Sequence, residues 1–104
     1  MSKYNNAKVK LDGEWFDSHK EGLRYRELQL LERAGEIADI ERQVTYELIP
    51  KQPGERAMKY IADFRYKNKE GQTIVEDVKG FKTEVYKIKR KLMKYVHGIT
   101  IQEV

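Results

Sequence analysis

A pair of adjoining strand-like segments places the tightest limit on how this chain folds. Residues 57–66 and 73–79 are rich in aromatic and β-branched residues that partly alternate with polar ones, which predicts two β-strands. The segment between them, residues 67–72, is polar and contains a glycine, as hairpin connections do. The two strands are therefore expected to pair in an antiparallel hairpin.

The register of this hairpin decides which acidic side chains meet. If the turn is centred within the polar segment, Asp63 faces Asp77, whereas a register one residue different places Glu76 there instead. Like charges directly opposed on a sheet destabilise it, so such a fold needs a compensating cation. Lys79 lies two residues after Asp77 and therefore points to the same face. Two carboxylates and one lysine on one face are the arrangement of a metal-assisted phosphodiester hydrolase.

A smaller hairpin is predicted near the N-terminus. The Asp-Gly pair at residues 12–13 is the favoured dipeptide of a type I′ turn, and it predicts short strands within residues 8–16. Trp15 and Phe16 are expected to pack onto the segment after them, and a flexible arm is the alternative interpretation of residues 8–16. Residues 1–7 are predicted to be a loose end.

Two segments have the residue spacing of amphipathic helices. The first begins at the capping-box pattern of Ser18 and Glu21 and ends near Ala34. The second runs from about residue 82 to residue 96. The stripes expected to face the core consist of Arg24, Tyr25, Leu28 and Leu31, widened by Leu23, Leu30 and Ala34, in the first helix, and of Val85, Ile88, Leu92 and Tyr95 in the second.

Two further strands are predicted, one before the central hairpin and one after the second helix. Residues 43–49 alternate apolar and polar positions, and residues 99–104 form a last β-like segment. The order is helix, three strands, helix and strand, preceded by the small hairpin, which is typical of an α/β protein with a mixed sheet flanked by two helices. A length of 104 residues predicts one domain, residues 1–104.

Composition limits the class of protein further. The absence of cysteine excludes disulfides and thiolate metal sites, and no apolar run approaches the length of a membrane-spanning helix, so no membrane partner is expected. The formal net charge is +4, which favours a polyanionic partner only where positive residues cluster.

The positive residues cluster in and just before the second predicted helix. Between Lys79 and Lys94 the sequence has seven basic residues and one acid, Glu84. This cluster predicts contacts with a nucleic-acid backbone, and Arg24 on the first helix is a further candidate because a guanidinium binds phosphate in bidentate fashion. A solvated amphipathic face is the alternative. The candidate DNA-binding residues are Lys82, Lys87, Lys89, Arg90, Lys91, Lys94 and Arg24.

The candidate metal site has oxygen ligands. Mg²⁺ is held by one or two carboxylates together with water and substrate phosphate, which Asp63 and Asp77 can provide, with the backbone carbonyl of Val78 as a third oxygen. Zn²⁺ would call for histidine or cysteine, and His19 and His97 lack the spacing of zinc ligands. Mg²⁺ is therefore the predicted cofactor, with Mn²⁺ as a substitute.

These residues and their order resemble the PD-(D/E)XK nuclease superfamily, whose restriction-endonuclease-like core is α-β-β-β-α-β. Its signature is an acidic residue on the second core strand, then Asp or Glu, any residue and Lys on the third. Here the signature falls on Asp63 and on Asp77-Val78-Lys79. Ala62 stands where the superfamily name has proline. Residues 16–21, 60–64, 75–80 and 87–92 look like a family of small phage- and prophage-encoded putative endonucleases with a domain of unknown function.

The resemblance implies an activity and a setting. It implies a Mg²⁺-dependent endonuclease acting on DNA, in the cytoplasm of a bacterial host, with Asp63, Asp77, Lys79 and Glu21 as catalytic residues and Glu21 as a further metal ligand from the first helix. The small size favours recognition of branched DNA such as a Holliday junction. Because a junction resolvase makes two symmetric cuts, the resemblance further implies a homodimer.

Alternatives remain open for the site and for the function. Ion pairs with neighbouring basic residues account for Asp63 and Asp77 without a metal, and the capping box accounts for Glu21. Glu76 competes with Asp77 for the position on the third strand. A non-catalytic nucleic-acid-binding module, or an accessory protein of a phage replication or packaging system, is the alternative function.

Overall fold

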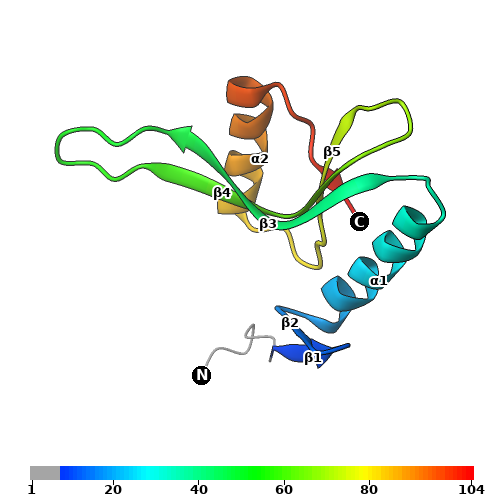
Figure 1. Cartoon of the computed structure of the whole chain (residues 1–104). Coiled ribbons are helices and arrows are strands. Elements are labelled where there is room, and N and C mark those ends of the chain that lie inside the picture. Colours follow the sequence, from blue (N-terminus) through cyan, green and yellow to red (C-terminus); the bar gives the residue numbers. More distant parts are fainter. Residues whose placement is uncertain (1–7) are drawn as a thin grey trace.

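A mixed four-stranded sheet organises the computed structural model, which describes residues 8–104 (Figure 1). Its strand order is β3-β4-β5-β6, antiparallel except for the last pair, β5 and β6, which is parallel. A two-stranded hairpin and a helix precede this sheet, and a second helix connects β5 to β6, so the predicted α/β class and element order are confirmed. The elements are β1 (Val9–Leu11), β2 (Glu14–Phe16), α1 (His19–Arg33), β3 (Ala38–Ile49), β4 (Met58–Lys67), β5 (Thr73–Asp77), α2 (Glu84–His97) and β6 (Gln102–Glu103).

The N-terminal hairpin has the predicted turn. Asp12 and Gly13 both have positive φ, 52° and 81°, as a type I′ turn requires. Phe16 is buried and packs against Tyr25 of α1, with the rings tilted and their centroids 5.6 Å apart. The predicted packing of Trp15 is wrong, because neighbouring strand residues point to opposite faces and Trp15 is on the exposed one. The predicted loose end, residues 1–7, lies outside the described residues.

Both helices begin at a hydroxyl cap. Ser18 Oγ accepts a hydrogen bond from the Glu21 amide at 3.1 Å, and Thr83 Oγ1 accepts one from the Tyr86 amide at 3.0 Å. The second helix ends at Gly98, whose φ of 68° is the left-handed conformation that glycine adopts freely. The helix boundaries lie within two residues of the predicted ones.

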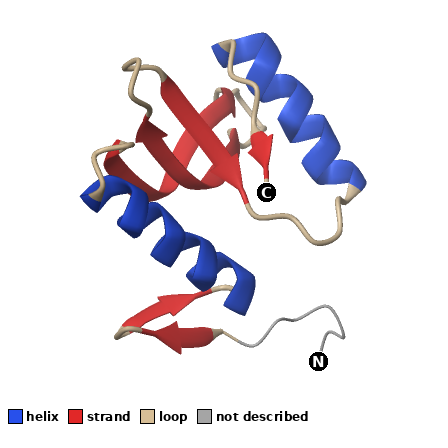
Figure 2. Ribbon diagram, turned by 90° about the vertical axis from the view of Figure 1, so that its right-hand side faces the viewer, coloured by secondary structure: helices blue, strands red, loops and turns tan. Residues whose placement is uncertain are grey.

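The helices lie on opposite sides of the sheet (Figure 2), and each covers a separate apolar cluster. The core beneath α1 is narrow, because only Leu28 among the predicted stripe is fully buried while Leu23, Leu30 and Leu31 are exposed. The two clusters consist of Leu28, Phe64 and Tyr66 on the α1 side, and of Leu48, Tyr60, Ala62, Val75, Tyr86, Met93 and Ile101 on the α2 side.

The inward face of α2 differs from the predicted one. Tyr86 and Met93 are buried, whereas Val85, Ile88 and Tyr95 are exposed, so the expected core stripe is wrong for these three residues. The helix is rotated because the phenol of Tyr86 has a partner inside the molecule: its hydroxyl donates to Glu103 Oε2 of β6 at 2.7 Å. A buried tyrosine hydroxyl requires such a partner. This hydrogen bond favours burial of the Tyr86 face over the face that carries Val85, Ile88 and Tyr95.

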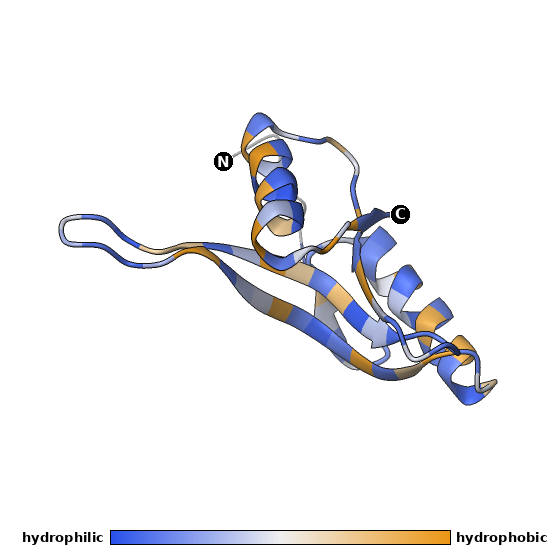
Figure 3. Ribbon diagram, turned by 90° about the horizontal axis from the view of Figure 1, so that it is seen from above, coloured by the Kyte–Doolittle hydropathy of each residue, from blue (hydrophilic) through white to orange (hydrophobic). Residues whose placement is uncertain are grey.

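Two strands have different lengths from those predicted. β3 starts at Ala38 instead of residue 43, because a register shift lies between Ala38 and Glu41 and hides the period-2 pattern in the sequence. β6 covers Gln102–Glu103 only, shorter than the predicted 99–104. The connection of β3 to β4, residues 50–57, projects away from both helices in two perpendicular views (Figures 1 and 3).

Candidate active site

The acidic pair lies where β4 and β5 separate. Phe64 pairs with Glu76, and one further step in this register would place Asp63 opposite Asp77, which is the predicted register. The ladder ends there, and the amide of Val78 donates to Asp63 Oδ2 at 2.8 Å instead. The separating strands therefore leave both carboxylates at the end of the hairpin ladder.

Asp77 is held by a phenol and a lysine. The residue is 3% exposed, and its Oδ2 accepts a hydrogen bond from the Tyr60 hydroxyl at 2.6 Å. Lys79 Nζ lies 3.1 Å from the same oxygen and 4.2 Å from the ring centroid of Tyr86. The prediction that Lys79 shares a face with Asp77 is confirmed by this ion pair.

Parallel pairing with the C-terminal residues fixes the segment that carries these groups. The amide of Lys79 donates to the Val104 carbonyl at 3.1 Å, and the amide of Val104 donates to the Asp77 carbonyl at 3.0 Å. These two bonds continue the β5–β6 ladder past the last strand residue. The backbone between Asp77 and Lys79 is thereby kept extended.

The two aspartates do not have enough positive charge around them. Burial raises the pKa of Asp63 to about 8, and the hydrogen bond and the negative charge of Asp77 act in the same direction. The hydrogen bond from the amide of Val78 lowers the pKa of Asp63, but by less than burial and Asp77 raise it. Near neutral pH, this pair therefore favours either an extra proton or a bound cation.

Glu76 belongs to the other side of the sheet. Its carboxylate is buried and accepts hydrogen bonds from Arg24 Nε at 2.9 Å and Nη2 at 2.6 Å, and also from the Tyr66 hydroxyl. Glu76 is thus occupied by Arg24, and of the two acids on the third strand Asp77 is the one that lines the cleft with Asp63. The bidentate pair also occupies the guanidinium of Arg24, so the arrangement does not support the predicted DNA contact of Arg24.

Glu21 is buried at the start of α1. Its side chain is 2% exposed, with Oε1 accepting from the Asp17 amide at 3.2 Å and Oε2 accepting from Gln43 Nε2 at 3.0 Å. Burial, and then the charge of Asp17, raise the pKa of Glu21. The carboxylate bonds to the Asp17 amide and to Gln43, so helix capping does not account for all of its contacts.

One open cleft brings the predicted catalytic residues together. It has a volume of about 590 Å³ and is bounded by α1, β3, β4, the end of β5 and the start of α2. Its walls include four predicted catalytic residues, a predicted backbone ligand, the predicted DNA-binding residue Lys89 and several residues that were not predicted for the site. These are Glu21, Asp63, Asp77, Lys79 and Val78, together with Gln43, Lys59, Tyr60, Ile61, Val85, Tyr86 and Lys89.

The donor set suits a metal held by few protein ligands. Within residues 8–104, no three histidine, cysteine, aspartate or glutamate side chains gather as a metal-binding group. Asp63 and Asp77 are two carboxylates, which matches the one or two that Mg²⁺ takes alongside waters and substrate oxygens. Glu21 lines the cleft without completing a three-acid group, and the role of the Val78 carbonyl stays a prediction.

The predicted basic surface of α2 divides into two. Lys89 lines the cleft, whereas Arg90, Lys91 and Lys94 line a separate groove of about 460 Å³ beside Tyr95. The division follows from helix geometry, since Lys89 and Lys91 are two residues and about 200° apart. Three of the basic residues are paired with acids: Lys82 and Arg90 contact Glu103 at 3.1 and 2.9 Å, and Lys87 contacts Glu84 at 3.2 Å.

Gln43 lines the cleft, but nothing in the sequence indicates that it belongs to the site. It has a φ of 53°, a left-handed conformation that is strained for a residue other than glycine, within a strand. Its amide nitrogen donates to Glu21. Nothing in the local pattern marks such a position, because both the backbone angle and the partner depend on the tertiary structure.

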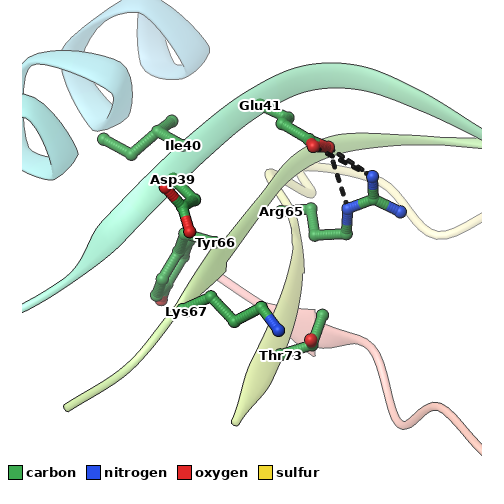
Figure 4. Close-up of a pocket in the computed structure, with 7 residues that line it drawn as sticks. All are labelled: Asp39, Ile40, Glu41, Arg65, Tyr66, Lys67 and Thr73. Carbon is green, nitrogen blue, oxygen red and sulfur yellow. Dashed lines mark hydrogen bonds and ion pairs between the residues drawn. The ribbon is translucent and has the colours of Figure 1, made fainter. Parts of the chain in front are cut away.

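A second depression holds none of the predicted site residues (Figure 4). It has a volume of about 560 Å³ and is crossed by an ion pair in which Arg65 Nε donates to Glu41 Oε2 at 3.0 Å. The carboxylate and the guanidinium therefore satisfy each other. Its lining consists of Asp39, Ile40, Glu41, Arg65, Tyr66, Lys67 and Thr73.

The fold and the cleft define an α/β protein with an acidic pair and a lysine at the point where two antiparallel strands separate. The chain belongs to the family described as "Protein of unknown function (DUF1064)", whose model matches residues 1–101. Curated proteins and solved structures give no match. The prediction of a family with a domain of unknown function is confirmed, and this description names neither a superfamily nor an activity.

The membrane prediction concerns the helices. Neither α1 nor α2, the helices formed by the described residues, has the length and apolar character needed to cross a bilayer.

Proposed function

We propose that this protein is a metal-dependent endonuclease that hydrolyses DNA phosphodiester bonds, as a phage-related member of the PD-(D/E)XK nuclease superfamily acting in the bacterial cytoplasm. The observation that carries the proposal is the meeting of Asp63, Asp77 and Lys79 in one open cleft. These residues come from two paired strands and the loop after them, and the hairpin register brings them into one cleft. A surface ion-pair network alone would not require Asp77 to be buried with Asp63 half-buried beside it.

The acidic pair is the proposed metal site. Asp63 and Asp77 hold Mg²⁺ or Mn²⁺, and the raised pKa of Asp63 supports this role because its causes, burial and the neighbouring Asp77, favour a bound cation. When bound, the metal ion polarises a phosphoryl oxygen and lowers the pKa of a coordinated water. The Tyr60 hydroxyl donates to Asp77 and thereby fixes the orientation of its carboxylate.

Lys79 is the proposed catalytic cation. Its ammonium group lies beside Asp77 and over the ring of Tyr86, so it enters the cleft in one orientation. There it stabilises the negative charge that develops on the phosphoryl oxygens and orients the attacking water. Lys59 and Lys89 line the same cleft and are the proposed contacts to neighbouring phosphates.

A cleavage assay tests the proposal. Linear, nicked and four-way-junction DNA are incubated with the protein in Mg²⁺, in Mn²⁺ and in EDTA, and the products are resolved on denaturing gels. We expect cutting in either metal and none in EDTA. Binding without cutting of any substrate would contradict the proposal and favour the non-catalytic nucleic-acid-binding or accessory function.

The homodimer belongs to the same proposal. Two symmetric cuts in a branched substrate call for two copies related by a twofold axis. Light scattering at micromolar concentration is expected to give the mass of a dimer. The mass of a monomer in the presence and absence of junction DNA would contradict this part of the proposal and leave the cleavage prediction in place.

Replacing Gln43 with alanine is expected to lower the cleavage rate by about 10–100-fold. The change removes the donor to Glu21 Oε2 and leaves a buried carboxylate oxygen without its partner. Single-turnover cleavage and thermal unfolding measure the two effects separately.

Asp39→Ala is the matched control for Gln43→Ala. Asp39 is also a β3 residue with positive φ, 59°, but it lines the other depression. Both changes carry a similar backbone cost, so a larger loss of stability in Gln43→Ala reports the unpaired oxygen of Glu21, and only Gln43→Ala is expected to lower the rate. Equal cleavage rates in the two variants would remove Gln43 from the site.

A further inference from the structure

Exposed apolar side chains lie in the cleft and in the loop next to it. Ile61 of β4 is 54% exposed and Val85 of α2 is 61% exposed, and both line the cleft. Phe81 is 83% exposed and lies in the loop between β5 and α2, between the cleft residues Lys79 and Thr83. Two exposed apolar residues within a polar cleft, with a third in the adjoining loop, offer apolar surface to a ligand bound there.

The apolar groups alternate with cations. Lys59 lies two residues before Ile61 and points to the same side of the strand, and Lys89 lies one helical turn after Val85. Lys59 and Lys89 both line the cleft as well. A ligand at the mouth of the cleft therefore meets positive charge and apolar surface in close succession.

Duplex DNA is a poor match for this combination. An intact duplex presents phosphates and sugars on its outside and keeps the faces of its bases stacked. Lysines at the cleft mouth would bind its phosphates, but Ile61, Phe81 and Val85 would gain little. A nucleotide without a pairing partner presents both a phosphate and a free base face, and bases stack well on aromatic and apolar side chains.

A second copy of the chain is also a poor match. Two cleft mouths facing each other would bring the lysines of both copies together, and like charges oppose such a contact. It would also close the cleft to any substrate. The two lysines at the mouth, Lys59 and Lys89, therefore favour a polyanion that carries flat apolar groups.

We propose that the cleft acts on a DNA strand whose bases are unpaired around the scissile phosphate, with Phe81 and Val85 packing against those bases. This inference rests on the proposed nuclease function and specifies its substrate class. Single-stranded segments, flaps and the openings of branched DNA provide such nucleotides. Lys59 and Lys89 bind the phosphates on either side.

A binding experiment without metal tests the inference independently of catalysis. Fluorescence anisotropy in EDTA compares a single-stranded oligonucleotide with a duplex of the same sequence, for wild type, Phe81→Ala and Tyr95→Ala. We expect wild type to prefer the single strand and Phe81→Ala to lose about tenfold in affinity for it. Affinity for the duplex is expected to change less than about twofold, since duplex contacts are to phosphate.

Tyr95→Ala is the matched control because Tyr95 is an equally exposed aromatic residue on α2 that lies outside the cleft. Neither change removes a buried group, so both variants are expected to fold. Equal binding of both DNA forms by wild type, or no selective loss in Phe81→Ala, would overturn the inference. A change in mass on light scattering in Phe81→Ala would show that a second copy covers the mouth, which also overturns it. Selective binding without cleavage under any metal would instead refute only the nuclease function.

Discussion

Lys79→Ala is expected to lower the rate of DNA cleavage by about 10²–10⁴-fold while the protein stays folded. Lys79 Nζ is the positive group next to Asp77, at 3.1 Å, and its removal takes away the cation that stabilises the charge developing on the phosphoryl group. Single-turnover cleavage at saturating protein measures this effect on the chemical step. Circular dichroism checks that the fold persists.

The fold is expected to survive because Lys79 contributes little to the core. It lies beyond the last residue of β5, and the bonds that hold its backbone come from its amide and from Val104. Removing the ammonium leaves Asp77 with the Tyr60 hydroxyl as a partner. The loss of an ion pair beside a buried carboxylate nevertheless predicts a small decrease in stability.

Two further variants separate charge from position. Lys79→Arg keeps a positive charge but changes its shape, so it is expected to recover part of the activity. Lys87→Ala removes the same charge from α2 outside the cleft, where Lys87 pairs with Glu84, and is expected to cleave at the wild-type rate. Wild-type cleavage by Lys79→Ala would exclude Lys79 from the catalytic machinery and with it the proposed site.

Local signals in the sequence account for most of the fold. The Asp-Gly turn, the hydroxyl caps at Ser18 and Thr83 and the glycine that ends α2 act through bonds within a few residues. Each could therefore be predicted without knowing the rest of the chain. The register of the β4–β5 hairpin follows from the length of a short connection, which is why the meeting of Asp63 and Asp77 was predictable.

The features that the sequence did not predict depend on contacts between distant residues. The inward face of α2 is decided by the bond of Tyr86 to Glu103, seventeen positions later, against an apolar stripe that periodicity alone favoured. The pairing of Arg24 with Glu76 joins α1 to β5 and removes a predicted phosphate contact. Helix periodicity gives the spacing of such residues but not their partners.

The same distinction applies to the cleft. Asp63, Asp77 and Lys79 lie close in sequence and were predicted together, whereas Gln43 enters through a strained backbone angle in β3. The split of the α2 lysines between two surfaces likewise depends on how the helix is rotated against the sheet. A basic run in the sequence counts charges but does not say which of them face the same ligand.

Asp63→Asn is expected to stabilise the metal-free protein by about 1–2 kcal/mol at neutral pH and to abolish cleavage. Asparagine keeps an oxygen for the Val78 amide, at 2.8 Å in the wild type, and removes the negative charge next to Asp77. Stability gained by removing a group from a site is typical of residues retained for function. Thermal and urea unfolding of the two proteins in EDTA measure the difference.

The pH dependence of this difference has a definite sign. The pKa of Asp63 is 3.8 in its reference state and about 8 in the fold, because burial and Asp77 favour the protonated carboxyl. Between these two values the folded state binds more protons than the unfolded state, so this group lowers the free energy of unfolding as pH rises and adds no further change above about 8. The stability advantage of Asp63→Asn is therefore expected to grow from about pH 5 to about pH 8.

Mg²⁺ is expected to offset the stability that the wild type loses as pH rises, and to do so much less in Asp63→Asn. A cation competes with the proton for the acidic pair, so Mg²⁺ is expected to raise the unfolding temperature of the wild type more at about pH 8 than at about pH 5. Asp63→Asn should lose most of this increment, whereas Asp39→Asn, an acid outside the cleft that asparagine replaces without backbone cost, should keep it. If Asp63→Asn were less stable than the wild type at both pH values, the ionised carboxylate of Asp63 would be stabilised by its surroundings in the fold. The acidic pair would then be a structural feature, and the case for a metal at this cleft would fail even with Lys79 in place.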